Sequence, residues 1–129
     1  MKYVYPVLFT RENDIYNVSV PDLPGCFTFG ETLSEAIEMA RDAICMWLCD
    51  AEDKGENIPK ANLITNLSPQ KDSFYNLIDA DTLEYRKEHD NKAVKKTLTI
   101  PSWLNAKAEK EGVNFSQVLQ DGLKRRLGL

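Results

Sequence analysis

Lys95-Lys96-Thr97-Leu98-Thr99-Ile100, closed by Pro101, is the stretch that decides how the C-terminal part of this chain folds. In an extended segment Leu98 and Ile100 share one face, while Lys95, Thr97 and Thr99 share the other, because strand side chains alternate. So short a strand cannot fold alone, and its simplest partner is the same strand of a second copy. A two-stranded antiparallel ribbon has the width to enter the DNA major groove.

Two helices are predicted after the proline. The first spans Ser102 to Glu111 and ends at Gly112. The second begins at Asn114, which has capping-box spacing to Gln117. Its apolar side chains form one stripe: Phe115, Val118, Leu119, Leu123 and Leu127.

Gly122 lies within this stripe and costs about 1 kcal/mol relative to alanine in a helix interior. Close approach of a second helix would explain it, and chance is the alternative. The free N–H groups at Phe115 and Ser116 would suit a DNA phosphate. The alternative is an ordinary helix start that contacts only water.

Length and composition indicate a globular protein. With 129 residues the chain has room for one ordinary domain or two very small ones. No apolar run is long enough to span a membrane, and the first residues lack the pattern of a secretory signal, so we expect a cytoplasmic protein.

The net charge of −4 is distributed unevenly. Residues 93–129 carry seven basic and three acidic side chains, which gives +4, whereas residues 1–92 carry nine and seventeen, which gives −8. A basic end and an acidic body favour two partners of opposite charge, although charge alone would also fit two solvated surfaces.

Cysteine and histidine offer little chemistry. Cys45 and Cys49 lie at i, i+4 in a helical pattern without a nearby histidine, so we expect them and Cys26 to be reduced, mostly buried thiols rather than zinc ligands. His89 lies in a charged stretch with no group to orient it, which favours a surface role over a catalytic one.

The N-terminal part is predicted to be a two-layer α+β unit. Its helix begins at Thr32, which forms a capping box with Glu35, and runs to about Asp53 before Gly55. A charged connector with a short helix follows at residues 81–92. The predicted strands are Tyr3–Phe9, Ile15–Val20, Cys26–Phe29, Lys60–Leu67 and Phe74–Ile78.

The strand-helix-helix order at the end of the chain resembles the ribbon-helix-helix repressors. Pro21-Asp22-Leu23-Pro24-Gly25-Cys26, then Gly30-Glu31-Thr32 and Glu35-Ala36, is similar to the N-terminal signature of the HicB antitoxins. The run from Asn91 to Pro101 is similar to that family's junction with its DNA-binding tail. The resemblance covers nearly the whole chain.

The resemblance implies an antitoxin that binds a HicA-type ribonuclease toxin, blocks its action on mRNA and represses its own operon as a dimer. It also implies a partial ribonuclease H-like sheet in residues 1–80 and a ribbon-helix-helix domain in residues 93–129, with a higher oligomer left open. We find no set of facing carboxylates for two-metal hydrolysis, so we expect a binding module without enzymatic activity, metal or cofactor. HicA toxins tend to be basic, which suits the acidic body.

Three groups of contact residues follow from this interpretation. The third group is the loop from Asp22 to Gly25, which could equally be a rigid turn that only sets the sheet geometry. We expect DNA base contacts from Lys95, Thr97 and Thr99; phosphate contacts from Lys96, Asn114, Phe115 and Ser116; and toxin contacts from Asp22, Leu23, Pro24 and Gly25.

Two other functions remain open at this point. The chain could be a ribbon-helix-helix regulator whose N-terminal domain binds another protein or a small ligand, because an α+β body is compatible with many ligands. A nuclease in its own right is disfavoured, since no metal or general-base constellation is evident.

Overall fold

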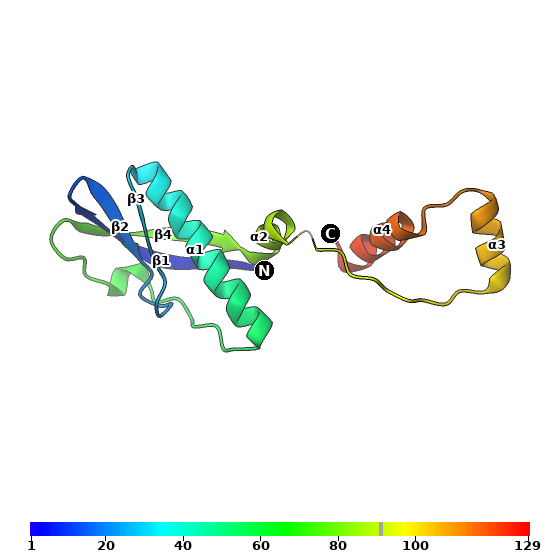
Figure 1. The fold of residues 1–129 in the computed structure, drawn as a ribbon. Coiled ribbons are helices and arrows are strands. Elements are labelled where there is room, and N and C mark those ends of the chain that lie inside the picture. Colours follow the sequence, from blue (N-terminus) through cyan, green and yellow to red (C-terminus); the bar gives the residue numbers. More distant parts are fainter. Residues whose placement is uncertain (91) are drawn as a thin grey trace. The chain divides into compact units, whose positions relative to one another are not determined.

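A four-stranded antiparallel sheet of order β3-β2-β1-β4 organises the N-terminal part of the chain (Figure 1). The computed structural model describes residues 1–90 and 92–129, and divides the chain into the units Met1–Lys92 and Ala93–Leu129. Asn91, where the predicted junction motif begins, lies outside the described residues. The strands are β1 (Lys2–Glu12), β2 (Ile15–Ser19), β3 (Phe27–Gly30) and β4 (Ser73–Asp81).

A two-residue turn joins β1 to β2. Asn13 and Asp14 have φ values of 51° and 62°. Two positive φ angles in succession are typical of the type I′ turn, whose twist matches that of the flanking strands, and Asn and Asp tolerate this conformation better than most residues.

One long helix, α1 (Leu33–Lys54), covers one face of the sheet (Figure 1). The Thr32 hydroxyl accepts the Glu35 N–H at 3.1 Å, and Gly55 ends the helix at φ 66°, as the sequence predicts. The Glu35 carboxylate instead accepts the Glu31 N–H at 3.1 Å, so the reciprocal bond of the capping box is shifted by one residue. The core between helix and sheet contains alternate residues of β1 and one stripe of α1: Tyr5, Val7, Phe9, Ala36, Ala40, Ile44 and Leu48.

Most of the predicted strands are present, but one is wrong. The segment Lys60–Leu67 forms a short 3₁₀ turn, η1 (Ile64–Asn66), instead of a strand. Both sides of β1 are already occupied by β2 and β4, and the Asn62 N–H bonds the Asp22 carboxylate at 3.0 Å. The segment is thus bonded to the Asp22 side chain at Asn62, turns at η1, and pairs with no strand of the sheet.

The predicted connector is partly built into the first unit. Its helix, α2 (Thr82–His89), is fastened to α1 because Arg86 pairs with Glu52 at 3.1 Å and with Asp53 at 3.0 Å. Arg86 also donates to the Cys49 carbonyl at 3.2 Å. The stretch from residue 81 to His89 thus belongs to the body and is not a free linker.

The second unit consists of α3 (Ser102–Lys110) and α4 (Phe115–Leu127), preceded by an extended segment. The Asn114 side chain accepts the Gln117 N–H at 3.1 Å, which confirms the predicted N-cap. The Gln117 side chain, however, donates to Asp121 at 2.9 Å, so the reciprocal half of that capping box is wrong. Within the described residues of this single chain, 92–101 form no ladder.

Candidate functional sites

The second unit leaves its apolar side chains exposed. No residue from 93 to 129 is buried, and Leu98 and Ile100 of the extended segment are 63% and 46% exposed. The predicted stripe of α4 is present but uncovered: Phe115, Val118, Leu119, Leu123 and Leu127 all lie open. A unit of this size without a core is not stable alone, so this face needs a cover.

The residues predicted to contact DNA all belong to this second unit. Lys95, Lys96, Thr97 and Thr99 are exposed and lie on the extended segment. Asn114 caps α4, and Phe115 and Ser116 supply its first main-chain N–H groups, as an anion site would need. The geometry gives each predicted residue an accessible side chain or helix start; the contacts themselves stay predictions.

The loop predicted to contact the toxin is tied to the body at several points. Asp22 accepts the main-chain and side-chain N–H groups of Asn62, and the Pro24 carbonyl accepts the Trp47 indole N–H at 2.9 Å. Leu23 is only 1% exposed and lies in the core. Pro24 and Gly25 are the exposed members of the loop, so only these two present much surface to a partner.

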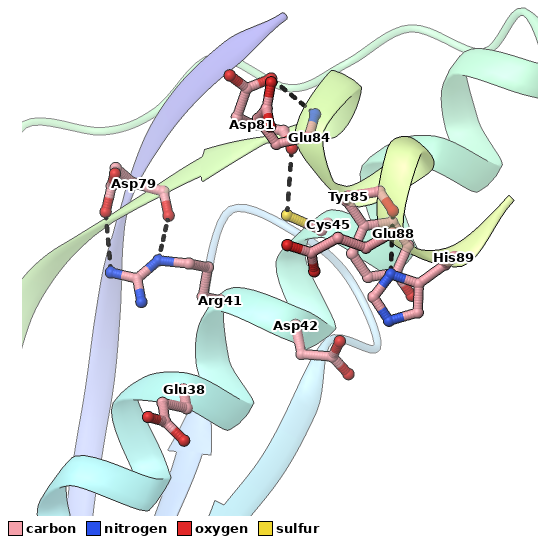
Figure 2. A pocket seen from close by; sticks show the side chains of 10 residues that line it. All are labelled: Glu38, Arg41, Asp42, Cys45, Asp79, Asp81, Glu84, Tyr85, Glu88 and His89. Atoms are coloured by element: carbon pink, nitrogen blue, oxygen red, sulfur yellow. Dashed lines mark hydrogen bonds and ion pairs between the residues drawn. The ribbon is translucent and has the colours of Figure 1, made fainter. Parts of the chain in front are cut away.

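A second feature is an acidic cleft between α1, α2 and β4 (Figure 2). The Tyr85 and His89 rings stack there, with centroids 4.1 Å apart, and the His89 Nδ1 lies 2.9 Å from the Tyr85 carbonyl. The cleft is lined by six carboxylates, one arginine and three other side chains: Glu38, Asp42, Asp79, Asp81, Glu84, Glu88, Arg41, Cys45, Tyr85 and His89.

Two of these carboxylates are held in the ionised form. The Arg41 guanidinium bonds Asp79 at 3.0 Å and lowers the pKa of that carboxyl. Burial acts to raise the pKa of Asp81, but the N–H groups of Glu84 and Leu83 bond its carboxylate, and the net pKa is lowered. These two carboxyls therefore stay ionised at neutral pH and are poor proton donors.

Sequence reasoning missed this cleft, although the sequence carried a signal. Glu38 and Asp42 on α1, and Glu84 and Glu88 on α2, are like charges at i, i+4. Such pairs destabilise a helix by a few tenths of a kcal/mol, roughly as much as opposite charges stabilise it. What the sequence could not supply is that α2 folds back onto α1.

Catalytic chemistry has little support in the described part of the chain. No group of three or more potential metal-ligating side chains is found among the described residues. Cys26, Cys45 and Cys49 are free and buried, and burial raises the pKa of Cys26 to about 11. A thiol with so high a pKa is a poor nucleophile at neutral pH. None of the described helices is long and apolar enough to cross a membrane.

Comparison with known proteins supplies the family. The model of the HicB-like antitoxins of bacterial toxin–antitoxin systems matches residues 5–121. A 14.9 kDa protein from the rep-hol intergenic region of Haemophilus phage HP1 is 38% identical over 104 residues, which cover 78% of this chain and 75% of that protein.

Two solved structures are similar over almost the full length. A chain of a toxin–antitoxin complex from Streptococcus pneumoniae has a TM-score of 0.63 and 30% identity, covering 98% of this chain and 99% of that one. The Burkholderia pseudomallei antitoxin HicB has a TM-score of 0.55 at 22% identity, covering 94% and 96%, and shares the mixed α+β fold. The chain therefore belongs to the HicB-like antitoxins of bacterial toxin–antitoxin systems, a family that is not enzymatic.

Proposed function

We propose that this chain is a dimeric antitoxin that neutralises a basic, mRNA-cleaving HicA-type toxin in the cytoplasm and represses its own operon. The family and the similarity to a chain of a toxin–antitoxin complex support the toxin partner. The four-stranded sheet with α1 then serves as a partial ribonuclease H-like scaffold that binds without catalysis. Residues 93–129 serve as a ribbon-helix-helix domain.

The observation that carries the dimer is the uncovered face of the second unit. Leu98 and Ile100 alternate with Thr97 and Thr99 on a segment that has no ladder partner in the described chain. Pairing with the same segment of a second copy satisfies the main-chain groups and lets two α4 stripes cover the apolar side of the ribbon. Both needs are met by one partner.

The opposite face of the ribbon then contacts the operator. Lys95, Thr97 and Thr99 read base edges in the major groove, because side chains on one face of a ribbon project together. Lys96 and the α4 start at Asn114, Phe115 and Ser116 hold phosphates. The +4 charge of residues 93–129 suits this partner.

The first unit contacts the toxin. Its net charge of −8 attracts a basic protein and speeds encounter. The loop at Asp22 and Leu23 acts mainly as a scaffold, since the first is bonded to Asn62 and the second is in the core. Pro24 and Gly25 form its contact surface.

Operator binding by matched variants tests the DNA half. Thr97→Ala and Thr99→Ala should relax sequence preference more than they lower nonspecific affinity, and Lys95→Ala should cost about 1–3 kcal/mol on operator DNA if it reads guanine. Lys96→Ala is the control: it should weaken all sequences alike and reduce the salt slope by about one. Unchanged footprints for all four variants would reject the ribbon assignment.

Co-expression tests the toxin half. We expect a neighbouring gene to encode a small basic chain that arrests growth when it is expressed alone, and co-expression of this chain should restore growth. A failure to restore growth, with both proteins present at comparable levels, would reject the pairing and favour a regulator that binds another ligand.

A further inference from the structure

The two outer strands of the sheet, β3 and β4, differ in how far their unpaired main-chain groups are bonded by the rest of the first unit. On β4 the Thr82 N–H bonds the Met1 carbonyl at 3.0 Å, in register with the β1–β4 ladder. Hydrogen-bonded pairs recur every second residue in an antiparallel ladder, so the odd-numbered residues of β4, from Ser73 to Asp81, turn their main-chain groups to the outside.

Side chains of α1 cover the C-terminal end of the β4 edge. The Arg41 Nε donates to the outward carbonyl of Asp79 at 3.1 Å. The Cys45 thiol lies 4.0 Å from the outward carbonyl of Asp81 (Figure 2). Folded proteins commonly protect sheet edges in this way, because unpaired strands recruit other chains.

The β3 edge has no such protection. The Val20 N–H bonds the Cys26 carbonyl at 3.1 Å, in register with the β2–β3 ladder, so Phe27 and Phe29 turn their main-chain groups outward. In the described part of the chain no side chain or loop bonds these groups. The same two residues have side chains that are 73% and 55% exposed.

These features together are those of a site for strand addition. Outward N–H and C=O groups supply the main-chain bonds of an added strand, and aromatic side chains beside them supply apolar contacts. A shallow hollow lies over β1, β2 and β3 on the inner side of this edge, and Phe27 forms part of its wall; it is lined by Leu8, Thr10, Asn17, Val18, Ser19, Phe27 and Thr28.

The negative charge of residues 1–92 indicates which partner adds a strand to β3. A second copy of this chain would bring another body of −8 against the first, whereas a basic partner is attracted. Two copies of this chain can also associate through another apolar face, that of residues 93–129, and do not need the β3 edge. We propose that the basic toxin docks by adding an extended strand to the free edge of β3, over Phe27 and Phe29. This proposal rests on the proposed function and names the surface that performs its toxin-binding half.

The test compares two exposed apolar residues on opposite edge strands. Phe27→Lys places a cation on the proposed site, and Leu77→Lys places the same cation on β4, where Leu77 is also about half exposed. Binding of the full-length variants is measured by calorimetry against the toxin identified by the co-expression test, in a catalytically inactivated form. Phe27→Lys should weaken binding by about tenfold or more, as loss of a central aromatic contact does, while Leu77→Lys stays within about threefold of the wild type.

A second measurement reports on the main chain. Amide exchange at Phe27 and Phe29 should be fast in the free protein and slow in the complex, because an added strand bonds those N–H groups. Operator affinity of Phe27→Lys should equal that of the wild type, since the substitution lies outside the DNA-binding unit.

The outcomes separate the two proposals. If the wild type binds the toxin but Phe27→Lys binds equally well, or amide exchange does not slow, strand addition at β3 is overturned while the antitoxin function stands. If the wild type does not bind this toxin, both are rejected. If Phe27→Lys only lowers the mass of the free protein in solution, the edge joins copies of this chain, and the toxin is not its occupant.

Discussion

Ile44 and Leu48 of α1 are fully buried, whereas Leu119 and Leu123 of α4 are 37% and 52% exposed, although all four lie on the apolar stripe of an amphipathic helix. The difference lies in what each helix finds within its own chain. α1 packs on a four-stranded sheet, while α4 shares its unit with only α3 and an unpaired extended segment. We therefore expect the first unit to be stable by itself and, with the proposed dimer, the stability of the second to depend on protein concentration.

The largest expected effect is on the core that the first unit closes alone. Leu48→Ala removes a fully buried side chain beneath α1 and should lower the free energy of unfolding by about 2–5 kcal/mol, independently of protein concentration. Urea unfolding followed by Trp47 fluorescence, in a Trp103→Phe background, measures this unit. Met46→Ala, at an exposed position of the same helix, should change stability by about 0.5 kcal/mol or less. A dependence of the Leu48→Ala effect on concentration would contradict the comparison.

The matching change in the second unit should act on association. Leu123→Ala should weaken the dimer by about 1.5–3 kcal/mol per copy, because the side chain becomes buried only when a second chain covers it. Sedimentation at several concentrations measures the dissociation constant, and the exposed Gln120→Ala is the control. A wild type that remains monomeric throughout would remove the basis of this prediction and of the proposed ribbon.

Two glycines also distinguish the packing of α1 from that of α4. A Cβ at Gly30 would lie 2.6 Å from the Ala36 Cα, so Gly30→Ala must push α1 from the sheet and should cost about 1–3 kcal/mol. A Cβ at Gly122 meets no atom within 4 Å in the chain by itself. Gly122→Ala should therefore stabilise α4 by up to about 1 kcal/mol, unless a second helix approaches there. Weaker dimerisation of Gly122→Ala in sedimentation would place this glycine at the interface.

The smallest effect concerns the fastening of α2 to α1. Burial acts to raise the pKa of Glu52, but bonds from Tyr3, Arg86 and Thr82 outweigh it, and the net pKa is lowered. A carboxyl with a lowered folded-state pKa adds stability above its unfolded pKa and loses it as the pH falls through the folded value. Glu52→Gln should cost about 1 kcal/mol at neutral pH and flatten the acid side of the stability profile.

Urea unfolding of the first unit over a pH series measures the Glu52 effect. Glu56→Gln, at an exposed residue outside this group of bonds, is the control. An equally steep loss of stability in acid for Glu52→Gln and the wild type would show that other carboxyls dominate.

Local patterns in the sequence were sufficient for most helices and strands. Thr32 and Asn114 as N-caps, Gly55 as a stop and the alternation in β1 each act within a few residues, so a linear pattern predicts them. Patterns also failed locally: the Gln117 side chain donates its amide N–H to Asp121, one turn further along the helix, and does not complete its capping box. The predicted site residues of the second unit are exposed, but Leu23 of the predicted loop is in the core.

The charge and periodicity of the sequence indicate two differently charged units, the second with an apolar face that its own residues are too few to cover. Which segments pair with one another is seen only in the three-dimensional fold. Lys60–Leu67 turns at η1 instead of pairing, Arg86 holds α2 on α1, and α1 side chains cover one end of the β4 edge while the β3 edge stays unbonded in the described residues. The physical reason is that a strand or an ion pair is completed by a partner distant in sequence, and local periodicity carries no information about which partner arrives.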